Sequence, residues 1–182
     1  MSRFIVTLEA FKTLIRLGIT MNKLLTAAAS VALFACATTA QADDEKHFDG
    51  LYLGGSVGYI DFGDSGVSYE GFLGFRKQND SGFVFGVEGT YGSADIDFLD
   101  NIWSVNGILG MVVGEEKRGL IFISTGYTEA KQSGFGLSAT SSGIRSDLGY
   151  EYSVSKNFAV RIQATTYEFD DFGASGGFIV KF

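Results

Sequence analysis

The sequence predicts an all-β protein: an eight-stranded antiparallel up-and-down transmembrane β-barrel, preceded by a cleavable signal peptide. Three observations lead to this fold class. Apolar residues alternate with small or polar ones in eight segments of about ten residues, the length of a tilted strand that crosses a membrane. Glycine is abundant, with 25 residues, but collagen-like and disordered chains are excluded because proline is absent and aromatics are common. The chain also ends on an aromatic residue, Phe182, directly after a lysine.

The N-terminal part has the pattern of a secretory signal peptide that begins at Met21. A basic residue, Lys23, precedes the apolar run TAAASVALFACA, and the small residues Ala40 and Ala42 frame a cleavage site just before Asp43. The apolar run is shorter than the ~20 residues that a membrane-spanning helix needs. We therefore divide the chain into an upstream extension, a signal peptide, an N-terminal periplasmic segment and the barrel, at residues 1–20, 21–42, 43–49 and 50–182.

The mature chain is strongly acidic, because removal of residues 1–42 leaves 20 acidic and 10 basic residues. Nucleic acid is therefore excluded as a partner, since a phosphate backbone demands a basic face. The only cysteine, Cys36, lies within the signal peptide in a stretch that resembles a lipidation site, with which the site at Ala42 competes. Cleavage after Ala42 leaves no cysteine and thus no disulfide framework. A start at Met1, with a longer basic region, is the alternative to the start at Met21.

Each of the eight segments carries its larger apolar residues on one face, as alternation requires. In chain order they are 50–60 (Leu51, Leu53, Val57, Tyr59), 67–76 (Tyr69, Leu73, Phe75), 82–91 (Phe83, Phe85, Val87, Tyr91), 102–112 (Trp103, Val105, Leu109, Met111), 120–128 (Ile121, Ile123, Tyr127), 143–152 (Ile144, Leu148, Tyr150, Tyr152), 158–167 (Phe158, Val160, Ile162) and 175–182 (Phe178, Val180, Phe182). The opposite faces hold glycines, small polar residues and eight charged residues: Glu70, Arg76, Glu88, Arg145, Asp147, Glu151, Arg161 and Lys181. Because the number of strands is even, the sheet can close with both ends on the same side.

The distribution of glycines and aromatics indicates that the apolar faces point outward into lipid. Glycine and small polar residues suit the crowded interior of an eight-stranded barrel, whereas a water-facing surface usually carries more charge. Aromatics near the strand ends form two girdles, one on the turn side and one on the loop side: Phe75, Phe83, Phe158 and Phe182, then Tyr59, Tyr69, Tyr91 and Trp103. A soluble lipocalin-like barrel, with the apolar faces inward, is the alternative.

The connections between the segments alternate in length. Three are short, at 77–82, 114–119 and 153–157, and four are longer or more acidic, at 61–66, 92–101, 129–142 and 168–174. Outer-membrane barrels have short periplasmic turns and longer external loops. We therefore expect the short connections to face the periplasm and the longer ones to face the exterior.

The C-terminus resembles a signature of bacterial outer-membrane barrels, in which the terminal aromatic follows apolar residues two and four positions earlier. Here these residues are Phe182, Val180 and Phe178. Four phrases resemble the small eight-stranded OmpA/OmpX-like, opacity-type porin family: GLYLGGSVGY, FVFGVEGTYG, WSVNGILGM and LGYEYSVSKNFAVRIQATTY. The resemblance covers nearly all of the mature chain. The sequence differs from this family at two positions. Asn106 stands where relatives often carry a basic residue, and Gln163 stands where they often carry a carboxylate.

This resemblance implies a monomeric barrel in the outer membrane of a Gram-negative bacterium, in contact with membrane lipid and lipopolysaccharide. It also implies that the barrel-assembly machinery reads the C-terminal signature. We expect the eight inward charges to pair as the structural filling of a narrow lumen, because unpaired charges away from water are costly. Within that filling, Arg145 and Arg161 are expected to meet Glu70 and Glu88. A small passive pore is the alternative.

No residue pattern indicates a catalytic, cofactor or metal site. The one histidine, His47, precedes the first strand at the end opposite the longer loops, where no Ser-His-acid arrangement can be built. A lipid-modifying enzyme is therefore the least favoured reading, and we expect a non-enzymatic structural or surface-interaction protein. The loops carry acids that either bind divalent cations or stand as solvated charge, without EF-hand spacing: Asp61, Asp64, Asp95, Asp97, Asp100, Glu168, Asp170 and Asp171.

Overall fold

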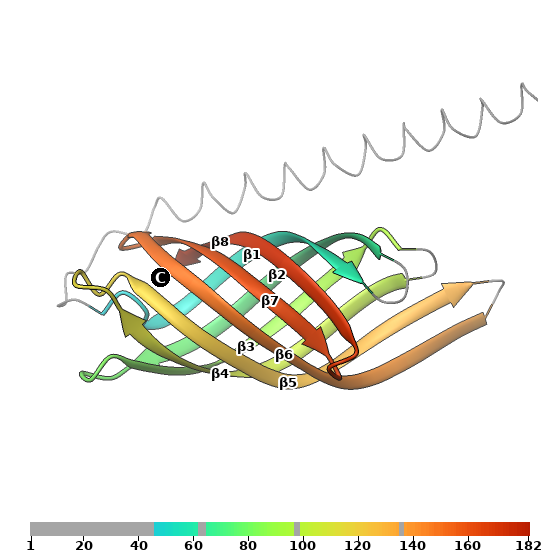
Figure 1. Cartoon of the computed structure of the whole chain (residues 1–182), viewed down its shortest axis with the longest axis horizontal. Coiled ribbons are helices and arrows are strands. Elements are labelled where there is room, and N and C mark those ends of the chain that lie inside the picture. The colour runs from blue at the N-terminus through green and yellow to red at the C-terminus, as the bar shows by residue number, and fades with distance from the viewer. Residues whose placement is uncertain (1–45, 62–64, 97–98, 135–136) are drawn as a thin grey trace, which may run out of the picture. The chain divides into compact units, whose positions relative to one another are not determined.

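Eight antiparallel strands close into a barrel in the computed structural model, which describes residues 46–61, 65–96, 99–134 and 137–182 (Figure 1). Each strand pairs with the next along the chain, and β8 pairs back with β1. The strands are β1 (Gly50–Asp61), β2 (Ser65–Gln78), β3 (Phe83–Ala94), β4 (Leu99–Val113), β5 (Gly119–Gly134), β6 (Leu137–Ser155), β7 (Phe158–Tyr167) and β8 (Asp171–Lys181). The predicted eight-stranded antiparallel barrel is thereby confirmed, whereas the predicted upstream extension and signal peptide, at residues 1–20 and 21–42, lie outside the described residues. Among these residues no helix is long and apolar enough to cross a bilayer.

The outer face of the barrel is apolar and the inner face is largely polar. In β7, Ile162 is 63% exposed while its neighbour Arg161 is 2% exposed, because successive side chains of a strand point to opposite faces. The same alternation follows the predicted faces in the other strands, where most of the large outward residues are exposed and Leu53 and Trp103 are half-buried. Val180 differs: it alternates with Phe178 and Phe182 but is only 5% exposed.

Glycine on the inner face is required by close packing inside the barrel. A Cβ added to Gly126 of β5 would overlap the Val105 carbonyl and the side chain of Asn106. At Gly107 of β4, which faces outward, an added Cβ would meet nothing nearer than the Thr125 carbonyl at 3.9 Å. The sequence argument placed glycines of the polar faces, such as Gly126, in the crowded interior, and the close contacts of Gly126 agree with it, whereas outward Gly107 has room.

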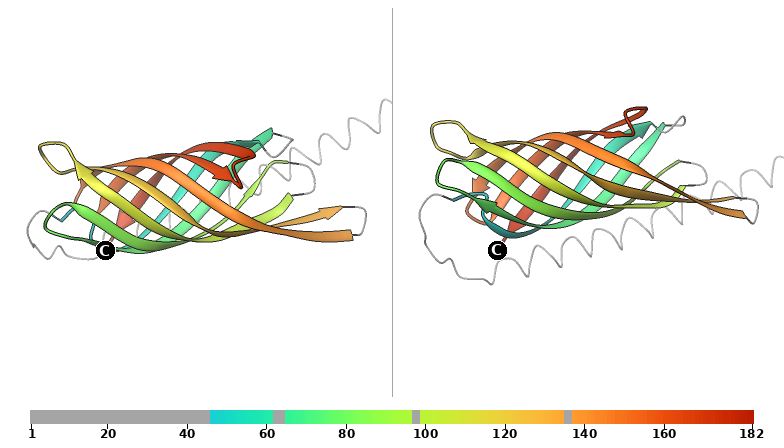
Figure 2. Two further views of the ribbon diagram at one scale, coloured as in Figure 1. Left: turned by 60° about the horizontal axis from the view of Figure 1, so that its bottom comes forward. Right: turned by 90° about the horizontal axis from the view of Figure 1, so that it is seen from below.

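The barrel has a turn end and a loop end. At the turn end, short connections join β2 to β3, β4 to β5 and β6 to β7, and the C-terminus lies at the same end (Figures 1 and 2). The remaining connections lie at the loop end. The expectation of a long loop at 129–142 is wrong, because β5 and β6 continue as a hairpin through most of it, with Lys131 opposite Thr140. Backbone pairing continues there without apolar alternation, so the pattern that located the other strands is missing.

Candidate functional site

The eight charged residues expected on the inner faces all point into the lumen. Arg76, Glu88, Arg145, Asp147, Glu151, Arg161 and Lys181 are buried, and the Glu70 side chain is 15% exposed. Four are cationic and four are anionic, so their formal charges cancel. They divide into a turn-side cluster and a loop-side cluster.

The turn-side cluster is built around two carboxylates, Glu151 of β6 and Glu88 of β3. Arg76 Nη1 donates to both carboxylate oxygens of Glu151, at 2.9 and 2.8 Å. Arg161 donates to one of these oxygens from Nε and from Nη2, at 3.0 and 2.7 Å. Arg161 also contacts Glu88, with Nη2 2.8 Å from one carboxylate oxygen, and the Tyr52 hydroxyl donates to Glu88 at 2.7 Å. The cluster therefore joins β1, β2, β3, β6 and β7 through charge-assisted hydrogen bonds.

Aromatic side chains enclose the turn-side guanidinium groups. The Arg161 guanidinium carbon lies 4.4 Å from the Phe72 ring centroid and 4.9 Å from that of Phe122, and Arg76 lies 4.4 Å from the Tyr52 ring. These distances are those of cation–π contacts. The inner faces were expected to hold glycines, small polar residues and charges, but the turn-side lumen also contains a continuous apolar core: Phe48, Tyr52, Phe72, Val84, Ile108, Leu120, Phe122, Ala159 and Ile179.

The segment before β1 closes over this core. Phe48 is fully buried, its backbone N–H donates to the Gln78 side chain at 3.1 Å, and its ring lies 5.2 Å from the Arg76 guanidinium carbon. Lys181 Nζ donates to the Ser153 hydroxyl at 2.6 Å and to the His47 carbonyl at 3.0 Å. His47, which the sequence places before the first strand, is therefore half-buried at the turn end, because burial of the adjacent Phe48 draws this segment inward.

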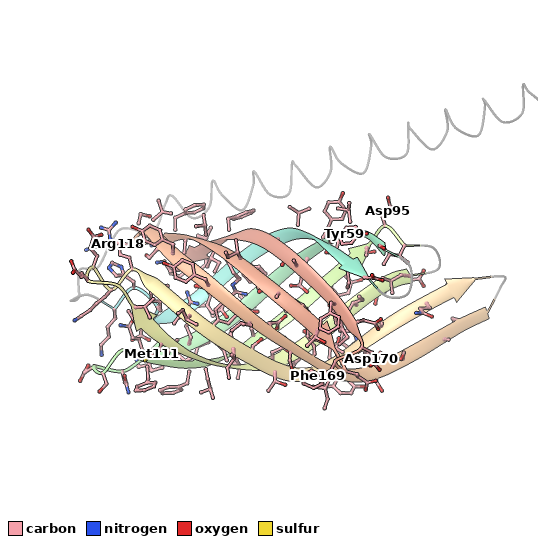
Figure 3. All side chains as sticks on the ribbon, viewed as in Figure 1. Tyr59, Asp95, Met111, Arg118, Phe169 and Asp170 are labelled. Atoms are coloured by element: carbon pink, nitrogen blue, oxygen red, sulfur yellow. The ribbon has the colours of Figure 1, made fainter. Side chains whose placement is uncertain are left out.

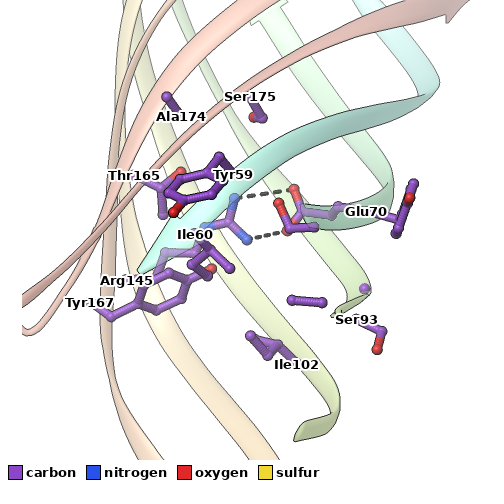
Figure 4. A pocket seen from close by; sticks show the side chains of 14 residues that line it. Tyr59, Ile60, Glu70, Ser93, Ile102, Arg145, Thr165, Tyr167, Ala174 and Ser175 are labelled. Carbon is purple, nitrogen blue, oxygen red and sulfur yellow. Dashed lines mark hydrogen bonds and ion pairs between the residues drawn. The ribbon is translucent and has the colours of Figure 1, made fainter. Parts of the chain in front are cut away.

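The loop-side cluster is centred on Arg145 of β6 (Figure 4). Its guanidinium forms a two-pronged ion pair with Glu70 of β2, and its Nε donates to Asp147 at 3.0 Å. Asp147 in turn accepts hydrogen bonds from the Ser124 and Thr165 hydroxyls, at 2.6 and 2.7 Å. The structure thus brings Arg145 to Glu70 and Arg161 to Glu88; from the sequence these two arginines were expected to meet these two glutamates, without assignment of which meets which.

Neutral polar residues occupy the lumen between the clusters. Thr90 and Ser104 share a hydrogen bond of 2.8 Å, and the Asn106 amide donates to Ser104 at 2.9 Å. The carbonyl oxygens of the Asn106 and Gln163 side chains are buried without a hydrogen-bond partner. At these two positions the sequence departs from the family that it resembles, whose members often carry a charged side chain there. In this chain each position holds an amide whose carbonyl oxygen has no hydrogen-bond partner within the described part of the structure.

A small cavity of about 40 Å³ lies at the loop end of the lumen, beside Arg145 (Figure 4). Its lining includes Tyr59, Tyr69 and Tyr167 together with the Glu70–Arg145 pair. This volume admits only a few water molecules. A hollow of about 430 Å³ lies elsewhere, among residues that are mostly outward-facing, including Leu109, Ile123 and Leu148.

The rim of the loop end is acidic. The described residues there include one exposed cation, Lys131, and seven acids: Asp61, Asp95, Asp100, Glu129, Glu168, Asp170 and Asp171. Asp170 and the 72%-exposed Phe169 lie together in the β7–β8 turn (Figure 3). The described part of the chain contains no group of three or more His, Cys, Asp or Glu residues placed to hold a metal ion.

Some expected site residues fall outside the described ranges. The cleavage-site residues Ala40, Ala42 and Asp43 do so, as do the loop acids Asp64 and Asp97. The expected girdle aromatics are described, and they lie on the outer face near the strand ends. Phe158 stacks on Phe178 at 6.4 Å between ring centroids, and Trp103 lies 5.6 Å from Tyr127.

Comparisons with known proteins agree on the fold. Residues 27–181 match the family described as outer membrane protein beta-barrel domain. No curated protein sequence matches the chain. Similar solved structures include a de novo designed transmembrane β-barrel, with a TM-score of 0.54, 17% identity, and coverage of 72% of this chain and 94% of that chain. The N-terminal β-barrel domain of Pseudomonas aeruginosa OprF has a TM-score of 0.52 and 14% identity, and the match covers 72% of this chain and 97% of that chain. Neisserial surface protein A has a TM-score of 0.51 and 17% identity, and the match covers 74% of this chain and 98% of that chain.

Proposed function

The chain belongs to the outer membrane protein beta-barrel domain family, and on this premise we propose that it is a non-enzymatic barrel with a closed lumen and a surface-interaction role. Its place is the bacterial outer membrane, as the family implies. The likeness to solved barrels supports the fold alone, since a designed barrel shares it equally. The functional argument therefore rests on the lumen and the rim.

One observation carries the proposal: the lumen charges neutralise one another across the barrel. Arg76 and Arg161 both bind Glu151, which is fully buried, and Arg145 binds Glu70 and Asp147. A conducting path must separate such pairs, and breaking a buried ion pair costs about 3–5 kcal/mol. The buried apolar core around Phe48 also supports a closed turn end, because its side chains fill the lumen there.

The apolar outer face supports contact with membrane lipid, and the acidic rim supports an external position for the loop end. In this orientation the turn end faces the periplasm, Phe182 completes the lower aromatic girdle, and the assembly machinery reads the C-terminal strand. Rim carboxylates then lie at the level of lipopolysaccharide phosphates, which they approach through bridging divalent cations. A signal peptide cleaved after Ala42 delivers the chain to this compartment.

The position of the only histidine supports a non-enzymatic role. His47 lies at the turn end, where its carbonyl accepts a hydrogen bond from Lys181. The loop end, which faces lipopolysaccharide in the proposed orientation, therefore has no imidazole to act as a general base.

Planar-bilayer recording of the purified mature protein tests the closed lumen. We expect no steady conductance from the wild type or from Ile162→Ser, which alters only the outer face. Arg161→Ser removes the cation between Glu88 and Glu151 and is expected to produce flickering openings. A stable unit conductance in the wild type indicates a passive pore instead. Mass spectrometry of lipid A from expressing cells tests the enzymatic alternative, and a mass change that depends on the protein contradicts the proposal.

A further inference from the structure

The eight strands close into a barrel, but β6 extends beyond the loop end of the barrel and, in the described part of the chain, has an unpaired edge there. β6 pairs with β5 from its first residue, Leu137, opposite Gly134, as far as Tyr152, opposite Gly119. Its pairing with β7 begins only at Arg145, opposite Tyr167, because β7 ends there. Among the described residues, no strand therefore pairs with residues 137–143 of β6 on the β7 side. Figures 1 and 2 show this part of the β5–β6 hairpin reaching beyond the other strands. We call residues 137–143 the β6 edge.

The backbone groups at this edge can be assigned from hydrogen bonds at its base. The Ile144 carbonyl accepts from the Glu168 N–H at 2.9 Å, so it points toward the β7 side. The Ser153 N–H donates to the Arg118 carbonyl, so it points toward the β5 side. In an antiparallel strand both backbone groups of one residue point the same way, and successive residues alternate. With no register shift between β5 and β6, the N–H and C=O groups of Ser138, Thr140 and Ser142 point toward the open edge.

The β6 edge has none of the features that normally prevent strand pairing. Exposed edges are usually blunted by lysine, proline, bulges or inward-pointing charges. The sequence of residues 138–143 is SATSSG, with no charged residue and no proline. Thr140 lies at its centre and is exposed. An uncovered, uncharged row of donors and acceptors is a template for an added strand.

The charge next to the edge indicates what kind of strand fits. A strand added here lies in line with β7, and its end meets the β7–β8 turn. That turn carries Glu168, Asp170 and Asp171, and the Glu168 carboxylate lies beside Gly143 at the base of the edge, 2.6 Å from where a Cβ would stand. We propose that the β6 edge binds an extended, positively charged polypeptide segment by β-strand addition. This inference rests on the proposed surface-interaction role and names the class of partner.

Charge also disfavours two other possible occupants of the β6 edge, a second copy of this chain and a polyanion. A second copy brings a further acidic rim, and the mature chain carries 20 acidic against 10 basic residues. Like charges at such an interface oppose pairing of two copies. A polyanion is opposed by the same carboxylates. A cationic strand gains both the backbone hydrogen bonds of the edge and the attraction of the β7–β8 turn, whose three acids outnumber the one exposed cation nearby, Lys131 of β5, which lies opposite Thr140.

Fluorescence anisotropy on the purified mature chain in nanodiscs tests the proposal at low ionic strength. The probe is a labelled synthetic peptide of alternating Thr and Val with Lys at both ends. Its controls are the same peptide with Glu in place of Lys, and the same peptide with N-methylated backbone amides. Two variants are compared: Thr140→Pro removes an edge N–H at a position where proline is tolerated, and Thr140→Val keeps the N–H and strand propensity. Heat-modifiable gel mobility verifies the barrel in both.

We expect the Lys peptide to bind the wild type and Thr140→Val alike, and Thr140→Pro to weaken it about tenfold or more. The Glu and N-methylated peptides are expected not to bind. Bound Lys peptide should slow amide hydrogen exchange at Ser138, Thr140 and Ser142. Equal binding to Thr140→Pro, equal binding of the N-methylated peptide, or self-association through this edge overturns the proposal.

The two proposals fail in different ways. A silent bilayer recording combined with no peptide binding rejects the cationic strand partner and leaves the closed, non-enzymatic barrel in place. A steady wild-type conductance rejects the closed barrel, whatever the peptide does.

Discussion

Glu151→Gln removes one negative charge from the turn-side cluster while keeping the size of the side chain. Glu151 is fully buried and accepts four hydrogen bonds, two from Arg76 and two from Arg161. Arg161 retains its contact with Glu88 after the change. Arg76 loses the only carboxylate that it contacts among the described residues. The substitution therefore leaves one buried guanidinium without a counter-charge.

The expected loss of stability follows from that unpaired charge. Removing one partner of a buried ion pair costs about 3–5 kcal/mol. The glutamine carbonyl still accepts a hydrogen bond, and the Tyr52 ring stays 4.4 Å from Arg76. Both effects place the expected loss near the lower limit, at about 3 kcal/mol, or roughly two powers of ten in the unfolding equilibrium. No cavity forms, so the change reports charge alone.

Urea unfolding of the refolded barrel in lipid vesicles measures this loss, with folded protein scored by its heat-modifiable gel mobility. Glu116→Gln is the matched control, because Glu116 is exposed and its contact with Arg118 is 3.5 Å long. Adding Arg76→Met to Glu151→Gln removes the unpaired cation and should recover much of the stability. If Glu151→Gln unfolds at the same urea concentration as Glu116→Gln, the charges of the cluster are not coupled and the reasoning is refuted.

Three further predictions concern other parts of the barrel. Gly126→Ala should prevent a heat-modifiable band from forming, because its Cβ overlaps the Val105 carbonyl, whereas outward Gly107→Ala should fold normally; equal folding would contradict close packing of the lumen. Asp80 is paired with Lys46 at 2.8 Å, and this hydrogen bond and charge hold the Asp80 pKa below its ordinary value. The pair therefore stabilises the fold above the ordinary carboxyl pKa, and this stabilisation is lost as pH falls through the lowered pKa of Asp80. In Lys46→Ala, NMR titration should show the Asp80 pKa return toward its ordinary value. An unchanged Asp80 pKa in that variant would exclude the pairing. Phe182→Ala should reduce the amount of folded barrel in outer-membrane fractions while sparing refolding in detergent, whereas an equal loss in both assays would indicate a stability defect.

Much of the barrel could be predicted because strand alternation is a local property. Successive residues of a strand, such as Arg161 and Ile162, point to opposite faces, so their position within the strand is enough to assign each to a face. No information about distant contacts is needed for that assignment. The same reasoning failed where the alternation of apolar residues stops. Residues 137–143 continue β6 through backbone hydrogen bonds, which leave no apolar pattern in the sequence.

The apolar filling of the turn-side lumen was also missed, although the sequence contained a signal. Phe72, Leu120 and Phe122 stand at positions whose parity puts them inside, among residues that were expected to be small or polar. Large residues on that face indicate a space to be filled, and the inward glycines opposite them provide it. An added Cβ at Gly149 would overlap the Phe122 ring.

The sequence by itself determined the existence of eight strands, which face of each carries the larger apolar residues, and the eight charged residues that enter the lumen. These follow from a two-residue period and from steric limits that act within a few residues. Only the tertiary structure decided which charges meet, how Phe48 closes the turn end, and where β6 loses its neighbour. Arg145 and Glu70 are 75 positions apart, and Arg161 and Glu88 are 73 apart. Their meeting depends on the tilt and stagger with which all eight strands close, a geometric property that no single segment carries.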